Sequence, residues 1–186
     1  MFSQAQTLSP NYWDSLDEYW KHAIFEAIGE REAIDAGLLY YIKQIESLDL
    51  YGTDITDLSP LMLFPNLRSL DISSTSIQDL SALRLVPHLE VLQAAYCSPF
   101  SLSDLTCCPS LTQLDLSYPS APHSSWESLD QLPNLSELFL NRTGISSIVD
   151  LLMLEKLQVL SVSFNPISAT EKAYLKELLP HAQLIL

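Results

Sequence analysis

The stretch Leu67-Arg68-Ser69-Leu70-Asp71-Ile72 is one copy of a pattern that recurs along most of the chain. The copies lie 22, 22, 22, 24 and 22 residues apart and begin at Ile45, Leu67, Leu89, Leu111, Leu135 and Leu157. The first, fourth and sixth positions of every copy are apolar, which makes eighteen apolar sites in a chain that is 47% hydrophobic. Self-similarity at a fixed period of this length indicates a repeat architecture.

Positions 4 and 6 of each copy alternate with more polar positions, which is typical of a short strand with one buried face. We predict six such strands, near residues 47–50, 69–72, 91–94, 113–116, 137–140 and 159–162. Later apolar residues such as Ile55, Leu58 and Leu61 are expected to enter the same core from the other sides of the turn. Because one turn cannot bury its apolar face alone, consecutive turns must stack.

The pattern LxxLxLxx(N)xI followed by xxLxxLxx resembles the 22-residue class of leucine-rich repeats, which bacterial internalins and phosphatase-regulatory repeat proteins use. The resemblance covers residues 45–167 and implies an α/β fold, a right-handed solenoid with about six parallel strands that line a concave surface. It also implies one domain over residues 1–186. The six repeats at 45–167 would lie between a helical N-terminal cap at 1–44 and a helical C-terminal cap at 168–186.

The ninth position of each repeat departs from the family, in which it is usually an Asn that forms a hydrogen-bonded ladder. Here it reads Thr53, Thr75, Cys97, Pro119, Thr143 and Asn165. Thr and Cys can still offer a hydrogen bond, whereas Pro119 cannot, and it falls in the one repeat that is two residues longer. We therefore expect residues 117–125 to bulge from the coil, either as a tolerated insertion or as a contact loop, before Trp126 restores the apolar spacing.

Helices are expected at both ends, since an uncapped solenoid exposes its core. Apolar residues at i, i+3, i+4 spacing between Leu16 and Ile28 predict an N-terminal helix, with Asp14 as its candidate N-cap and Gly29 as its end. A second short helix is expected from Glu30 to Ala36, with Gly37 ending it.

At the other end, Ser168-Ala169-Thr170-Glu171 has capping-box spacing and predicts a helix to about Leu179, where Pro180 follows. Residues 184–186 are expected to add a last edge strand. With a cap at each end, the chain is expected to be an independent protein.

The charge balance restricts the partners. The chain has 23 acidic and 9 basic residues, a formal net charge of −14. Lys and Arg dominate affinity for nucleic acid, so this composition argues against a nucleic-acid partner, and equally against an anionic membrane surface. A basic protein partner would be attracted. No run of residues is long and apolar enough to span a membrane.

Residues with catalytic or metal-binding chemistry form no recognisable constellation. Motifs such as GxGxxG, GxxxxGK[ST], GxSxG and HExxH are absent, and the four histidines are scattered singly. Cys107 and Cys108 are adjacent, which disfavours a shared metal ion; Cys108 reads as a buried thiol and Cys97 as a ladder residue. We therefore expect no catalytic site, metal or cofactor. Three cysteines and no visible signal peptide predict a protein of the reducing cytoplasm.

Residues that flank the buried strand positions should point outward from the concave sheet. Aspartates form a column at position 5 toward the N-terminal half, and aromatic residues with an arginine occupy the later repeats; aromatics and Arg dominate binding hot spots. The predicted partner-binding residues are Asp49, Asp71, Tyr96, Asp115, Tyr118, Phe139, Asn141, Arg142 and Phe164.

These features predict a non-enzymatic, monomeric protein that binds a protein partner through its concave sheet. The alternative is an immunity or inhibitor protein that covers a cognate toxin or enzyme, which small size and acidity also suit. The sequence names neither the partner nor the source organism.

Overall fold

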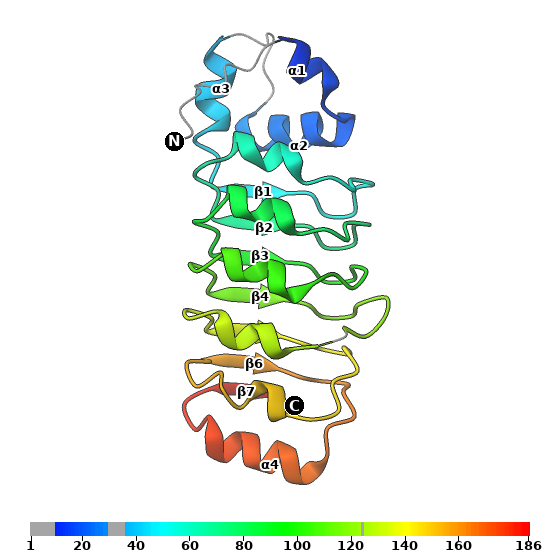
Figure 1. The fold of residues 1–186 in the computed structure, drawn as a ribbon, viewed down its shortest axis with the longest axis vertical. Coiled ribbons are helices and arrows are strands. Elements are labelled where there is room, and N and C mark those ends of the chain that lie inside the picture. The colour runs from blue at the N-terminus through cyan, green and yellow to red at the C-terminus, as the bar shows by residue number, and fades with distance from the viewer. Residues whose placement is uncertain (1–9, 30–35, 124) are drawn as a thin grey trace.

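The computed structural model describes residues 10–29, 36–123 and 125–186, and Figure 1 shows their repeats stacked in a single elongated column. Within these residues, seven parallel strands form one sheet in chain order. The strands are β1 (Ser47–Asp49), β2 (Ser69–Asp71), β3 (Val91–Gln93), β4 (Gln113–Asp115), β5 (Glu137–Phe139), β6 (Val159–Ser161) and β7 (Gln183–Ile185). The six repeat strands and the added edge strand are confirmed, each repeat strand one residue shorter than expected.

The register of the sheet follows the repeat. The fourth position of each repeat pairs with the fourth position of the next, from Leu48 with Leu70 through to Leu138 with Leu160, and Leu184 of β7 continues the row. All eighteen sites predicted from the pattern are buried. The convex wall consists of short 3-10 helices at Ser59–Leu63, Ser81–Leu85, Leu102–Cys107, Glu127–Gln131 and Val149–Leu151. A 22-residue turn leaves room for only such short helices on its return path.

The Thr, Cys and Asn side chains at the ninth positions make the hydrogen bonds that the pattern predicts, which Pro119 cannot. Thr75 Oγ1 donates to the Ile72 carbonyl at 2.6 Å, and Cys97 Sγ donates to the same carbonyl at 3.1 Å. Asn165 Nδ2 donates to the carbonyl of Leu140 at 2.6 Å. Cys97 and Asn165 thus bond a carbonyl of the preceding turn, and Thr75 bonds one of its own turn, so Thr and Cys do replace the family's Asn.

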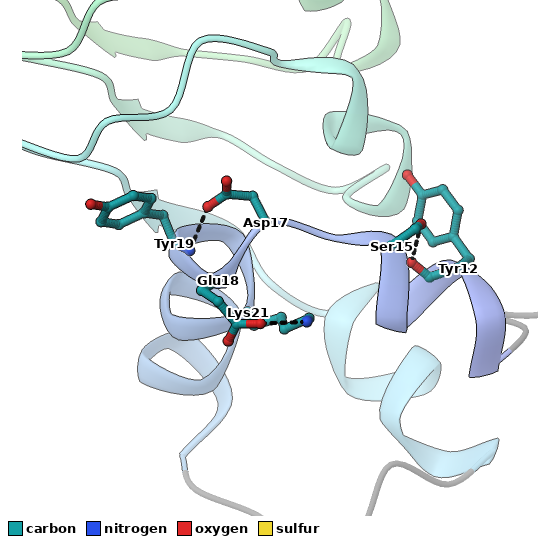
Figure 2. Close-up of polar contacts among 6 residues, drawn as sticks. All are labelled: Tyr12, Ser15, Asp17, Glu18, Tyr19 and Lys21. Carbon is teal, nitrogen blue, oxygen red and sulfur yellow. Dashed lines mark hydrogen bonds and ion pairs between the residues drawn. The ribbon is translucent and has the colours of Figure 1, made fainter.

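The N-terminal cap differs from the prediction. It contains α1 (Pro10–Ser15), α2 (Glu18–Ile28) and α3 (Ala36–Ile42). The predicted N-cap, Asp14, is wrong, because Asp14 lies inside α1. Asp17 caps α2 instead, and Figure 2 shows its Oδ1 accepting from the Tyr19 backbone N–H at 2.8 Å. The chain therefore breaks between two helices where a single one was expected.

Gly29 ends α2 with a φ of 78°, as predicted. The expected role of Gly37 is wrong, because Gly37 lies inside α3; residues 30–35 of the second predicted helix lie outside the described residues. Leu38 and Ile42 of α3 are both buried, so tertiary packing outweighs the weak helix propensity of glycine.

Helix α2 covers the first repeat. Trp20 stacks on Phe64 with ring centroids 6.0 Å apart, and its Nε1 donates to the Asp57 carbonyl at 3.1 Å. Tyr19 is exposed, and its hydroxyl donates to Asp54 Oδ2. Lys21 pairs with Glu18, one turn earlier on the same helix (Figure 2).

The C-terminal cap is α4 (Ala169–Leu178), and its capping box is confirmed. The Glu171 backbone N–H donates to Ser168 Oγ, and the Ser168 backbone N–H donates to Glu171 Oε2, each at 3.2 Å. Leu175 and Leu179 close the core at this end. Among the described helices, none has both the length and the apolar character needed to cross a membrane.

Candidate protein-binding surface

The eighth residue of every repeat has a left-handed backbone. These residues and their φ angles are Gly52 (66°), Ser74 (59°), Tyr96 (60°), Tyr118 (57°), Arg142 (54°) and Phe164 (61°). The turn is fixed by hydrogen bonds between repeats, such as the one from the Tyr96 N–H to the Ser117 carbonyl at 2.9 Å. Only glycine adopts this conformation without steric cost, yet three aromatic residues and an arginine occupy it here.

Four of these residues form a surface that we call the aromatic ridge, defined as Tyr96, Tyr118, Arg142 and Phe164. The rings of Tyr96 and Tyr118 stack with centroids 4.9 Å apart and planes 8° from parallel. Tyr96 is 58% exposed and Phe164 is 79% exposed. The ridge therefore presents large apolar area to solvent on one edge of the concave face, in the later repeats as predicted.

The last three ridge residues enclose a hollow. Tyr118, Arg142 and Phe164 line a depression of about 240 Å³ that is open to solvent. Arg142 is exposed. In the part of the chain that the structure describes, the ion pairs are Lys21 with Glu18, His22 with Glu26 and Arg68 with Glu90. Arg142 takes part in none of these ion pairs, so its guanidinium has no acidic partner among the described residues.

The aspartate column has a structural role that the sequence analysis missed. Each Oδ1 accepts the backbone N–H two residues later: Asp49 from Tyr51 at 2.8 Å, Asp71 from Ser73 at 2.7 Å, and Asp115 from Ser117 at 2.8 Å. The sequence signal for this role is an Asp two residues before the position where the chain leaves the strand, because that is the spacing of an Asx turn. Asp49 is exposed and the other two are half-buried, so their charge still reaches the concave surface.

Positions 5 and 7 were expected to face outward throughout, and at three serines this is wrong. Ser73, Ser117 and Ser161 are buried. Ser73 Oγ accepts from the Ala95 N–H, and Ser117 Oγ accepts from the Asn141 N–H, both at 3.1 Å. The side chains of Ser73 and Ser117 pack between neighbouring turns because their hydroxyls accept hydrogen bonds from the backbone of the next repeat.

Asn141 takes part in the same polar network. Its Oδ1 accepts from Ser161 Oγ at 2.6 Å and from the Ser163 N–H at 3.0 Å, and its Nδ2 donates to Ser117 Oγ. Phe139 is half-buried and lies between Asp115 and Ser161 in the sheet register. Of the nine predicted residues, the structure groups Tyr96, Tyr118, Arg142 and Phe164 on the ridge. It places Asp49, Asp71, Asp115 and Phe139 on the strands and Asn141 in the turn after β5.

The lengthened repeat is anchored to the body of the protein. After β4 the chain projects beyond the neighbouring turns (Figure 1) and is held back by the Ser120 N–H, which donates to the Cys97 carbonyl at 3.0 Å. The His123 ring packs against Phe100 and Trp126, with centroids 5.3 and 5.1 Å apart. Burial lowers the pKa of His123. The predicted bulge is confirmed, and its centre is packed.

A second hollow lies between the N-terminal cap and the first repeat, with a volume of about 260 Å³. Its lining includes Asp17, Asp54 and Asp57. Each carboxylate already accepts a hydrogen bond from a neighbouring residue: Asp17 from Tyr19, Asp54 from the Tyr19 hydroxyl, and Asp57 from Ser59. The Tyr19–Asp54 bond joins the cap to the first repeat, whereas the other two are local.

The cysteines are free thiols; Cys108 is buried as predicted, and the ladder residue Cys97 is buried as well. Burial raises the pKa of both, so neither thiol ionises readily near neutral pH. Among residues 10–29, 36–123 and 125–186, no three His, Cys, Asp or Glu side chains gather in a group that could hold a metal ion.

Comparison with known proteins agrees with this architecture. A family model described as leucine-rich repeats in two copies matches residues 43–85. The internalin inlF of Listeria monocytogenes superposes with a TM-score of 0.67 at 17% identity over 91% of this chain, which spans 55% of that protein. A leucine-rich-repeat protein of Leptospira interrogans gives 0.63 at 23% identity, over 86% of this chain and 42% of its own.

Internalin C2 of Listeria monocytogenes gives a TM-score of 0.57 at 18% identity, over 90% of this chain and 93% of its own. The chain thus spans only about half of the first two structures. No curated protein sequence matches it. At these identities the solved structures establish the fold.

Proposed function

We propose that this chain, which is a leucine-rich-repeat protein, binds a protein partner with the aromatic ridge and the adjoining concave sheet. Proteins with this fold are typically interaction modules without enzymatic activity. The parallel strands hold the side chains of successive repeats in register, so the ridge is a rigid, extended surface.

The observation that carries the proposal is the residue type at the eighth positions. Gly52 shows which residue this conformation favours, yet Tyr96, Tyr118 and Phe164 occupy the equivalent turns. Strained backbone conformations are concentrated at functional sites. Tyr and Arg are also enriched among the residues that contribute most binding energy at protein interfaces. Large side chains that are exposed and conformationally disfavoured have no role in filling the core, which favours a role in binding.

A second candidate function is an inhibitor or immunity protein that covers a cognate toxin or enzyme. The net charge of −14 favours it, because a basic target would be attracted and guided to the surface. A neighbouring gene that encodes a toxin would favour this alternative over a general interaction module. We further propose that the protein acts as a monomer in a reducing cytoplasm; sedimentation and cell fractionation test these two points.

The test is affinity capture of the partner from the source cell, followed by binding measurements with Tyr96→Ala, Tyr118→Ala and Phe164→Ala. At least one variant should lose about 2 kcal/mol of binding free energy, roughly thirtyfold in Kd. Tyr40→Ala is the matched control, because Tyr40 is 64% exposed and packs edge-on against Tyr41, away from the ridge on α3.

All three ridge variants binding like the parent would contradict the proposal. If changes within residues 119–126 abolished binding at the same time, the lengthened repeat would be the contact surface. Folded stability must be checked for each variant. It should change little for Tyr96→Ala and Phe164→Ala, because exposed side chains leave no cavity.

A further inference from the structure

We propose that the hollow lined by Tyr118, Arg142 and Phe164 binds a carboxylate group of the protein partner, from an Asp or Glu side chain beside an apolar residue. The inference rests on the proposed function and names the chemistry of one contact within it. It also assigns the partner a mixed character: a surface that is basic overall and carries one acidic residue at this point.

The geometry of the hollow suits such a group. Two rings and one guanidinium line a depression of about 240 Å³, so an apolar side chain and its acidic neighbour meet complementary surfaces. Tyr118 is held in place because its ring stacks on Tyr96. A guanidinium donates in a planar fork that matches the two oxygens of a carboxylate. When a partner covers the hollow, the rings exclude water and strengthen that interaction.

The charges on this face make Arg142 distinctive. Among the side chains at positions 3, 5, 7 and 8 of the six repeats, Arg142 is the single basic residue. No acidic side chain within the described residues pairs with it. An unpaired guanidinium between exposed rings offers hydrogen bonds that only an incoming acceptor can use, and it fixes the register of the partner along the sheet.

The net charge of this protein favours a carboxylate that a basic protein carries over a free carboxylate. A net charge of −14 weakens the binding of a free anion, but salt screens this effect beyond the Debye length, about 10 Å at 0.1 M, so a free carboxylate can still report on the contact with Arg142. An acidic side chain on a basic carrier escapes this penalty, because the carrier is attracted as a whole. Asp71 and Asp115, on strands earlier in the sheet, would face the basic residues of the same partner.

The experiment is an NMR titration of the labelled protein at 0.15 M salt, with three probes that share a phenyl ring: 3-phenylpropionate, 3-phenylpropionamide and phenyl phosphate. We expect the Arg142 Nε–Hε signal and the amide signals of Tyr118 and Phe164 to move with 3-phenylpropionate. The neutral amide should bind about tenfold more weakly, since it lacks the charge-assisted hydrogen bonds.

Arg142→Gln should remove the preference for the carboxylate over the amide. Arg84→Gln is the matched control, because Arg84 is an exposed arginine on the convex side that bonds the Ser81 carbonyl, and it should keep the preference. Equal affinity for acid and amide, shifts outside the hollow or no shifts, or a preference that persists in Arg142→Gln would each overturn the proposal. Tighter binding of phenyl phosphate would overturn it in favour of a phosphate group.

The carboxylate contact and the proposed function can fail independently in these experiments. If the ridge alanine variants weaken partner binding while 3-phenylpropionate and its amide bind equally, only the carboxylate contact is wrong. If the carboxylate preference holds while the ridge variants bind the partner normally, the hollow is an anion site and the proposed interface is wrong.

Discussion

Leu92 and Leu114 lie at the fourth position of the two central repeats, and both side chains are fully buried. Replacing either with Ala should cost about 2–5 kcal/mol of unfolding free energy, because burial is lost and a cavity remains. The denaturant midpoint is the measurement, since repeat arrays can depart from two-state unfolding. Leu85→Ala on the convex wall, where the side chain is partly exposed, should shift the midpoint less. An unchanged midpoint for Leu92→Ala would mean that position 4 does not support the core.

The backbone strain at the eighth positions can be tested by substitution. No heavy atom lies within 4 Å of where a β-carbon would stand on Gly52, so Gly52→Ala tests the backbone alone. It should destabilise the fold by about 1 kcal/mol, because Ala resists a positive φ. Phe164→Gly should be more stable than Phe164→Ala by a similar amount, measured by urea unfolding. Equal stabilities in both comparisons would show that these turns carry no strain, which would remove one support for the proposed function.

Single residues also show the limit of what the repeat pattern could predict. Apolar spacing identified Leu92 as buried because burial follows directly from period and chemistry. It could not identify the left-handed backbone of Tyr96, because that angle is imposed by hydrogen bonds to the next repeat. The burial of Ser117 escaped prediction for the same reason, since its partner is the Asn141 backbone N–H, 24 residues away.

At the scale of elements, the strands and the C-terminal helix were predictable because their signals are local and repeated. The capping box at Ser168 is a pattern of four residues, and α4 begins where that pattern places it. The N-terminal cap was harder because Asp14 and Asp17 are both good N-cap residues by type. Which of them caps α2 depends on how Trp20 and Ile24 pack on the first repeat, and that is a tertiary effect.

The lengthened repeat carries a prediction on pH. Burial of His123 among Phe100 and Trp126 lowers its pKa below the ordinary value of about 6.5. The folded state therefore binds a proton on His123 less readily than the unfolded state does. The stabilisation from the neutral His123 ring is complete above about pH 6.5 and declines as the pH falls below that value. Thermal midpoints at about pH 7.5 and pH 5.5 should differ less in His123→Gln than in the parent. Equal pH dependence in the parent and in His123→Gln would contradict burial of this ring.

At the scale of the whole molecule, the sheet and the charge act together. The solenoid holds Asp49, Asp71 and Asp115 in the same sheet as the strands that lead to the ridge, so long-range attraction and close contact share one face. The structure shows that these carboxylates also hold the strand ends, which the column of charges alone did not reveal. Their two roles can be separated, because asparagine keeps the accepting oxygen while losing the charge.

Asparagine substitutions separate the charge of the three aspartates from their hydrogen bonds. Asp49→Asn, Asp71→Asn and Asp115→Asn should slow association with a captured basic partner and flatten its dependence on salt, because steering acts mainly on the association rate. Dissociation rates and unfolding midpoints should stay close to the parent, since the amide oxygen still accepts the N–H of the residue two positions later. Asp71→Ala is the matched control: it removes charge and hydrogen bond together, so it should also lower stability, by about 1 kcal/mol. If the three Asn variants associated at the parent's rate at low salt, the acidic column would serve only to hold the strand ends, and recognition would rest on the ridge alone.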